Sequence, residues 1–213
     1  MAVVEKKAAK KRAAAKSSGR KGKFRNETHP AGEYLYFVEG TLEDFYNLEE
    51  QKAEFLEEGI LVMHSPASVT HERVFRQIFR SLCDFVEEKG LGEVLGSQLT
   101  IVLGKRRFAP DIVFISKNNP GKFGEVEFIG APELVVEIVS KTTRPYDLKI
   151  KREIYREYKI REIYFIDYLN KTLIVDVLQG DGYVTHTLKE GQFASVLLKG
   201  FAVKCFGASN SST

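Results

Sequence analysis

The segment Leu134–Val139 constrains the fold more than any other part of the chain. Its sequence, LVVEIV, is almost continuously apolar. Such a run is typical of a strand that is buried on both faces of a sheet. A sheet gains two covered faces when helices pack against it, so this segment predicts an α/β protein. Glu137 is the one charged residue in the run, and a buried strand has to compensate its charge.

The order of the flanking segments predicts the rest of the core. Apolar residues spaced by three and four define one face of a long helix over 68–89, and Gly90 is expected to end it. Residues 93–103, 111–115 and 133–139 are predicted strands, 147–158 a helix, and 162–168 and 171–178 strands. Before them we expect a strand at 34–38, a short helix at 41–51 and a hairpin at 54–63. The prediction is a mixed sheet with an α-β-β-β-α-β core, flanked by helices, with additional N- and C-terminal β-hairpins.

Charge divides the chain into two unlike parts. The first 25 residues hold ten Lys or Arg and one acid, a net of +9, which leaves 22 basic and 28 acidic residues, a net of −6, for the remainder. We expect a disordered basic tail over 1–32, a folded domain over 33–208 and a disordered C-terminus over 209–213. The tail is either an arm that binds polyanions or a solubilising extension.

Composition excludes several classes of protein. At 43% hydrophobic residues the chain can bury a core, yet no apolar run approaches the roughly 20 residues of a membrane span. Cys83 and Cys205 are too few for a disulfide scaffold, and no secretory signal is found, so a cytoplasmic location is expected. P-loop, dinucleotide-binding and Ser-His-Asp patterns are absent from the sequence.

Two acids are candidates for chemistry. Glu137 requires a metal ion, an arginine or a set of donors as its partner. Asp111 follows Pro110 at the start of another apolar strand, and if the two strands are neighbours the carboxylates meet at one end of the sheet. Oxygen ligands of this kind suit Mg²⁺ when substrate phosphate completes its shell. The alternative is an ion pair between Glu137 and a residue such as Arg144.

These residues carry a family resemblance. Pro110-Asp111, followed by Glu137, resembles the PD-(D/E)xK nuclease superfamily. The string GAPELVVEIVS at 130–140, with Asp147, Lys151 and Tyr155 after it, resembles the Uma2 family, which is described as restriction endonucleases. The hairpin at 54–63 and the Ser-Pro…His segment at 65–71 also match, so the resemblance covers about 41–208.

The resemblance implies an endonuclease that hydrolyses DNA. Mg²⁺, with Mn²⁺ as a substitute, would be held by Asp111, Glu137 and the backbone carbonyl of Ile138. Val139 fills the slot where the superfamily carries its lysine. The family's helix lysine matches Lys151, which shares a helix face with Asp147 and Tyr155. Other candidates for this cation are Lys141 and Lys149.

Further residues are assigned weaker roles. His71, Glu72 and Tyr155 are candidate accessory residues, and Glu54 is a candidate further carboxylate in the cleft. Candidate nucleic-acid contacts are Lys105, Arg106, Arg107, Lys149 and Arg152. The alternatives are an ordinary hairpin tip at 104–107 and a solvated helix of i,i+4 ion pairs. The expected partner is DNA, and cleavage of both strands favours a homodimer. The rival functions are an inactive nuclease fold that binds nucleic acid or a protein, and a structural protein.

Overall fold

The computed structural model describes residues 34–48, 52–96 and 98–204. The predictions for the basic tail at 1–32 and for the C-terminus at 209–213 lie outside these residues. Among the described helices, none combines the length and apolarity needed to cross a membrane.

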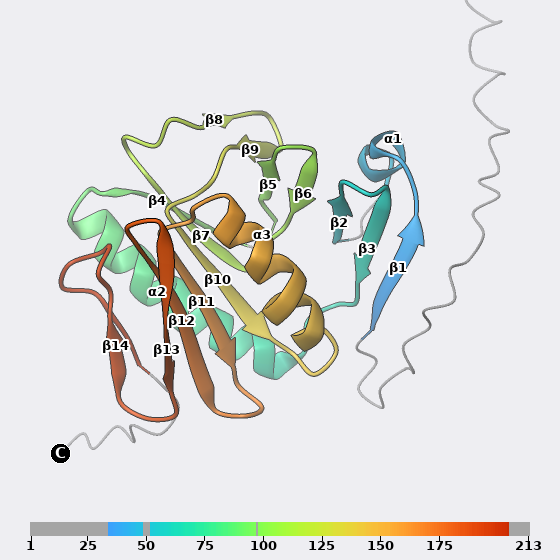
Figure 1. Ribbon diagram of the computed structural model, residues 1–213. Coiled ribbons are helices and arrows are strands. Elements are labelled where there is room, and N and C mark those ends of the chain that lie inside the picture. Colours follow the sequence, from blue (N-terminus) through green and yellow to red (C-terminus); the bar gives the residue numbers. More distant parts are fainter. Residues whose placement is uncertain (1–33, 49–51, 97, 205–213) are drawn as a thin grey trace, which may run out of the picture.

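A six-stranded mixed sheet forms the centre of the domain (Figure 1). Its strands, in spatial order, are β13 (Gly182–Leu188), β12 (Thr172–Gln179), β11 (Glu162–Asp167), β10 (Leu134–Val139), β7 (Ile112–Ser116) and β4 (Gly92–Gly96). The strands β10 and β11 are parallel, and the other neighbours are antiparallel. Every residue of β10 is buried. The predicted α/β fold with a central buried strand is therefore confirmed.

Helices cover both faces of this sheet, as Figure 1 shows. The long helix α2 (Val69–Glu88) packs Ile78, Leu82 and Val86 into the same core cluster as Leu134 and Val136 of β10. On the other face lie a π-helical turn, η1 (Tyr146–Lys151), and the helix α3 (Arg152–Glu157). Helix α2 ends at Glu88, Lys89 is its C-cap, and Gly90 follows with φ +56°, so the predicted glycine stop is confirmed.

A second sheet of seven strands extends the domain beside η1 and α3. Its order is β1 (Leu35–Glu39), β3 (Ile60–His64), β2 (Ala53–Leu56), β6 (Arg106–Phe108), β5 (Thr100–Leu103), β9 (Glu127–Ile129) and β8 (Lys122–Phe123). The predicted hairpin at 54–63 is β2–β3, although three residues, Glu57 to Gly59, connect its strands rather than two. The helix α1 (Leu42–Tyr46) is shorter than predicted.

The prediction of one strand over 93–103 is wrong. The chain turns after Gly96, where the Leu99 N–H donates to the Gly96 carbonyl at 3.0 Å. As a result β4 belongs to the six-stranded sheet and β5 to the seven-stranded one. The expected C-terminal hairpins are β12–β13 and the small pair β14 (Gln192–Ala194) and β15 (Ala202–Lys204).

Strand alternation places the two candidate acids on one face. In β10, Leu134 and Val136 point toward α2, whereas Val135 and Val139 pack on the η1 and α3 side. Glu137 has the parity of the second pair. In β7, Ile112 pairs with Val136 and shares its face, so Asp111, one residue earlier, lies on the η1 side. The fold therefore directs both carboxylates toward η1.

Candidate active site

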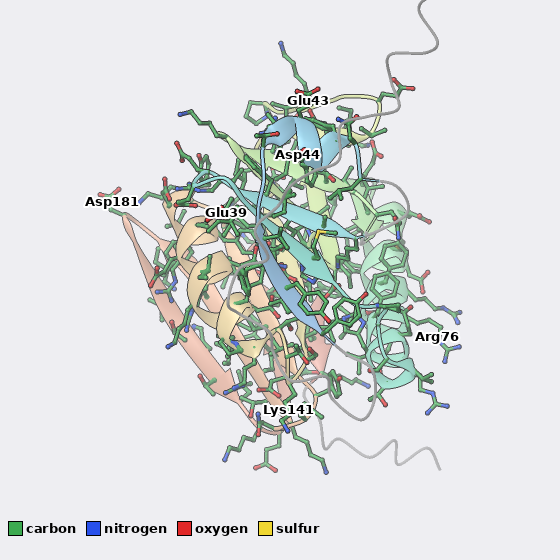
Figure 2. The ribbon with its side chains drawn as sticks, turned by 90° about the vertical axis from the view of Figure 1, so that its right-hand side faces the viewer. Glu39, Glu43, Asp44, Arg76, Lys141 and Asp181 are labelled. Atoms are coloured by element: carbon green, nitrogen blue, oxygen red, sulfur yellow. The ribbon has the colours of Figure 1, made fainter. Side chains whose placement is uncertain are left out.

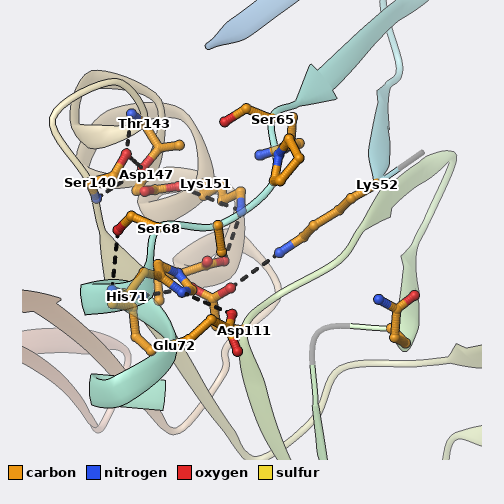
Figure 3. Close-up of a pocket in the computed structure, with 16 residues that line it drawn as sticks. Lys52, Ser65, Ser68, His71, Glu72, Asp111, Ser140, Thr143, Asp147 and Lys151 are labelled. Atoms are coloured by element: carbon orange, nitrogen blue, oxygen red, sulfur yellow. Dashed lines mark hydrogen bonds and ion pairs between the residues drawn. The ribbon is translucent and has the colours of Figure 1, made fainter. Parts of the chain in front are cut away.

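A cavity of about 240 Å³ opens beside the ends of β7 and β10 (Figure 3). It is lined from both sheets, from the first turn of α2 and from η1. Among its lining residues are Lys52, His71, Glu72, Asp111, Glu137, Ile138, Asp147 and Lys151. The sequence-predicted residues Asp111, Glu137 and Lys151 thus surround one space, together with the accessory candidates His71 and Glu72.

Lys151 lies at the centre of a buried ionic cluster. Its Nζ is 2.9 Å from Glu54 Oε1, 3.0 Å from Glu137 Oε1 and 3.5 Å from Asp147 Oδ1, and the residue is 1% exposed. Burial alone would lower the pKa of Lys151, but Glu137, Glu54 and Asp147 raise it well above its usual value. The lysine is therefore a permanently charged ammonium within the site.

The helix that carries Lys151 begins as a π-helix rather than as the predicted α-helix. The π-helical stretch covers Tyr146–Lys151, and regular α-helix follows from Arg152. Short π-helical stretches occur often at functional sites. The predicted grouping still forms, because Asp147 contacts Lys151 and the Tyr155 hydroxyl donates to Glu137 Oε1 at 2.6 Å.

Glu137 is only partly compensated by these neighbours. Burial raises its pKa to about 8, and the nearby acids Asp147, Asp111 and Glu54 act in the same direction against Lys151. The alternative partner Arg144 instead pairs with Asp167. The Glu137 carboxylate therefore sits where additional positive charge would be favourable.

Asp111 is held by three groups from different elements. Its Oδ1 is 3.1 Å from Lys52 Nζ, and its Oδ2 accepts the Ile138 N–H at 2.8 Å and lies 3.2 Å from His71 Nε2. Burial alone would raise the pKa of Asp111, but Lys52, His71 and the Ile138 N–H lower it well below its usual value. Asp111 is therefore an ionised carboxylate at the cavity wall.

The start of α2 positions His71. Ser68 caps the helix by accepting the His71 N–H at 3.2 Å, which fixes the first turn beside the cavity. Glu72 lies next to it, with Oε1 3.6 Å from His71 Nδ1, but its side chain is 59% exposed. Of the three accessory candidates, His71 and Tyr155 contact buried acids, whereas Glu72 contacts only His71 among the described residues.

Two residues of the site were missed or underrated in the sequence. Glu54 is fully buried in β2, where Oε1 also accepts the Ala109 N–H at 2.9 Å and Oε2 lies 3.2 Å from His64 Nε2. Its signal was a charged residue beside the apolar pair Phe55-Leu56, the same kind of anomaly as Glu137. Lys52 precedes the strand and gave no signal, because a lysine before a strand is ordinarily solvated.

The predicted nucleic-acid contacts lie elsewhere. Lys105 and Arg106 each approach Glu57 at 3.4 Å, and Arg106 also approaches Glu157 at 3.2 Å. Arg107 donates to the Tyr46 hydroxyl at 3.0 Å. None of these residues lines the cavity as described, which favours the alternative of an ordinary hairpin tip.

The other basic candidates also point away from the cavity. Lys149 is exposed on η1, and Figure 2 shows Lys141 at the outer surface. Neither residue lines the described cavity, so of the three candidate cations only Lys151 does. Arg152 donates two hydrogen bonds of 2.7 Å to Asp176, which joins α3 to the sheet. We interpret Arg152 as a structural residue.

Replacing Asp176 by Asn is expected to lower the free energy of unfolding by about 2 kcal/mol near neutral pH. Burial alone would raise the pKa of Asp176, but Arg152, Arg156 and Thr185 lower it to about 2. A carboxyl with a lowered folded-state pKa stabilises the fold above its unfolded pKa, about 3.9, and this contribution is lost as the pH falls toward 2. Urea unfolding of both proteins should show a stability difference that shrinks from about pH 5 downward. A difference that is constant with pH would contradict the prediction.

The charge balance around the cavity suits a divalent cation. Four buried acids, Glu54, Asp111, Glu137 and Asp147, surround two ammonium groups, Lys52 and Lys151, which leaves two surplus negative charges when all four carboxyls are ionised and the histidines are neutral. No group of three or more His, Cys, Asp or Glu in the described ranges is arranged to hold a metal ion by itself. A site here would therefore need a further oxygen ligand.

Ile138 can supply that oxygen through its main chain. Its N–H points toward β7, where it donates to Asp111, and the carbonyl of the same residue points to the same side of the strand. Continuing the β7–β10 register from the pair Ile112 and Val136 brings Pro110 opposite Ile138. Because proline has no N–H, it offers this carbonyl no ladder hydrogen bond. The donor set of two carboxylates and one carbonyl fits Mg²⁺ with waters completing the shell.

Comparison with known proteins gives a consistent result. The family model Uma2, described as "Putative restriction endonuclease", matches residues 42–204. A solved structure of a putative nuclease belonging to DUF820 from Anabaena variabilis superposes with a TM-score of 0.59 at 21% identity. The match covers 70% of this chain and 84% of that chain, and it shows a shared fold. No curated protein matches the chain.

Proposed function

This chain belongs to the Uma2 family, and on that premise we propose that it is a Mg²⁺-dependent endonuclease that hydrolyses DNA phosphodiester bonds in the Asp111–Glu137 cavity. One observation carries the proposal: three buried acids, Asp111, Glu137 and Asp147, and two lysines line a single cavity, and a fourth buried acid, Glu54, contacts Lys151. Packing of the core does not explain this cluster, because each buried charge opposes folding unless it is compensated.

Asp111, Glu137 and the Ile138 carbonyl would hold the ion, with Mn²⁺ as a substitute for Mg²⁺. When bound, the ion supplies Lewis acidity and a more acidic water. The protein positions the two carboxylate ligands. The Ile138 N–H and His71 fix the Asp111 carboxylate, and Tyr155 and Lys151 fix Glu137.

Lys151 would orient the attacking water and offset charge on the scissile phosphate. Its ammonium is held against Glu54, Glu137 and Asp147, so it needs no rearrangement when charge develops. Val139 occupies the position where the superfamily carries its lysine. It lies in β10 and packs on the η1 and α3 side of the sheet. Lys151, on η1, has its Nζ 3.0 Å from Glu137 Oε1, which supports the proposal that it takes the role of the missing strand lysine. This contact favours the enzyme over the inactive binding module.

The test is cleavage of supercoiled plasmid by the full-length protein with Mg²⁺, with EDTA as the metal-free comparison. Asp111→Ala and Glu137→Ala should each lower the cleavage rate by about 10²-fold or more, because each removes a proposed ligand. Asp181→Ala is the matched control, since Asp181 lies exposed at the tip of the β12–β13 hairpin (Figure 2).

Cleavage by both alanine variants at the wild-type rate would show that the activity does not come from this site. DNA binding without cleavage, together with no Mn²⁺ site in a calorimetric titration, would identify the inactive module instead. The ratio of nicked to linear product also tests the predicted homodimer, because two coupled active sites produce linear DNA without accumulating the nicked form.

A further inference from the structure

Lys52 contacts the proposed metal ligand from the cavity mouth. It directly precedes β2, and its Nζ lies 3.1 Å from Asp111 Oδ1 (Figure 3). No role for Lys52 was predicted from the sequence, and the proposed mechanism uses only Lys151. The site therefore holds a second ammonium whose purpose is unexplained.

The two lysines of the site differ in how firmly they are held. Lys151 has three carboxylates within 3.5 Å and is 1% exposed. Among the described residues, Lys52 forms an ion pair with Asp111 alone, and its side chain is 27% exposed. Because Lys52 is partly exposed on a long flexible side chain, it can leave Asp111 when another cation takes its place there.

The contacts of Asp111 indicate where a metal ion has to approach. Oδ2 already accepts the Ile138 N–H and lies near His71 Nε2, which accounts for both of its lone-pair directions. Within the described part of the chain, the one hydrogen-bond or ion-pair partner of Oδ1 is Lys52. An ion bound by Asp111 therefore takes Oδ1, beside an ammonium of like charge. The ion pair and the metal bond compete for the same oxygen.

We propose that Lys52 is an exchangeable cation. It neutralises Asp111 in the metal-free protein, and it turns to the scissile phosphate when a divalent ion takes Oδ1. The inference rests on the proposed function, because it needs both a metal and a phosphodiester in the cavity. Release of Lys52 by the ion strengthens phosphate binding, and by linkage a bound phosphate strengthens metal binding.

The first test is a calorimetric titration of the full-length protein with Mn²⁺ alone. Lys52→Met keeps the length of the side chain and removes its charge. The variant is expected to bind Mn²⁺ about tenfold more tightly, because no ammonium has to be displaced from Asp111. Lys149→Met is the matched control, since Lys149 is exposed and does not line the cavity. Unchanged or weaker Mn²⁺ binding by Lys52→Met would overturn the proposal.

The second test measures a short fluorescein-labelled DNA duplex binding in Ca²⁺. Lys52→Met should weaken this binding about tenfold and reduce the slope of log K against log salt by about one, the signature of one lost phosphate contact. A merely structural lysine would leave that slope unchanged, and this result would overturn the phosphate role.

A structure of the wild-type protein with Mn²⁺ decides the exchange even if Lys52→Met fails to fold. Lys52 Nζ should then lie outside ion-pair distance of Asp111 Oδ1, and an intact pair beside a bound ion would overturn the proposal. Failure of the wild type to bind Mn²⁺ would instead remove the metal from the proposed function. Binding of Mn²⁺ by the wild type with no gain in Lys52→Met would remove only the exchange.

Discussion

Replacing Lys151 by Met is expected to destabilise the protein by about 3 to 5 kcal/mol and to lower the cleavage rate by about 10²- to 10³-fold. The variant preserves the volume of the side chain but leaves three buried carboxylates, Glu54, Glu137 and Asp147, without their shared cation. Removing one partner of a buried ionic group destabilises the fold by more than the whole group stabilises it, because an uncompensated charge remains.

Urea unfolding and plasmid cleavage measure the two effects of Lys151→Met. Cleavage is assayed at a temperature where circular dichroism shows the variant folded, so that loss of activity is not loss of protein. Lys149→Met, on the exposed side of η1, should change neither quantity. A Lys151→Met protein with wild-type stability would contradict the buried cluster, and one with wild-type activity would contradict the catalytic assignment.

The fold was predictable where the pattern is local. The spacing of apolar residues in 68–89 specifies α2, and the continuous run in β10 specifies a strand covered on both faces. Asp111 and Glu137 were predictable for a related reason: each is a charge in an apolar strand context, and strand alternation then decides which face it shares. Lys151 followed from the family resemblance together with its four-residue spacing to Asp147 and Tyr155, whereas the π-helical geometry of η1 was not predicted.

The rest depends on contacts between residues distant in sequence. Strands β4 and β5 are separate because they join different sheets, and no local sequence pattern predicts this difference. The partners of several basic residues are also distant in sequence. Arg106 pairs with Glu157, 51 residues away, and Arg152 with Asp176, 24 residues away, and neither pair can be predicted from a local pattern. Lys52 reaches Asp111 across 59 residues.

Glu137→Gln is expected to lower the cleavage rate by about 10²-fold or more without destabilising the protein, unlike Lys151→Met. The unfolding free energy of the metal-free variant should equal that of the wild type or exceed it by about 1 to 3 kcal/mol. Glutamine keeps the shape and can still accept a hydrogen bond from Tyr155. Lys151 retains two carboxylates, Glu54 and Asp147, so no uncompensated cation is left. The change removes a carboxylate that burial disfavours, as its pKa of about 8 indicates. Although Lys151 Nζ and Glu137 Oε1 are 3.0 Å apart, the two substitutions should thus have different effects on the unfolding free energy: Lys151→Met lowers it and Glu137→Gln does not.

Thermal unfolding in EDTA and in excess Mg²⁺ tests this prediction. The wild type should gain stability from Mg²⁺, because an ion that binds only the folded state raises the unfolding free energy, whereas Glu137→Gln should gain little. Asp181→Asn, an exposed carboxylate removed far from the cavity, should respond to Mg²⁺ as the wild type does. A Glu137→Gln protein that is less stable than the wild type in EDTA would show that Glu137 is a structural ion-pair partner of Lys151. The surplus charge of the cavity would then no longer indicate a metal site.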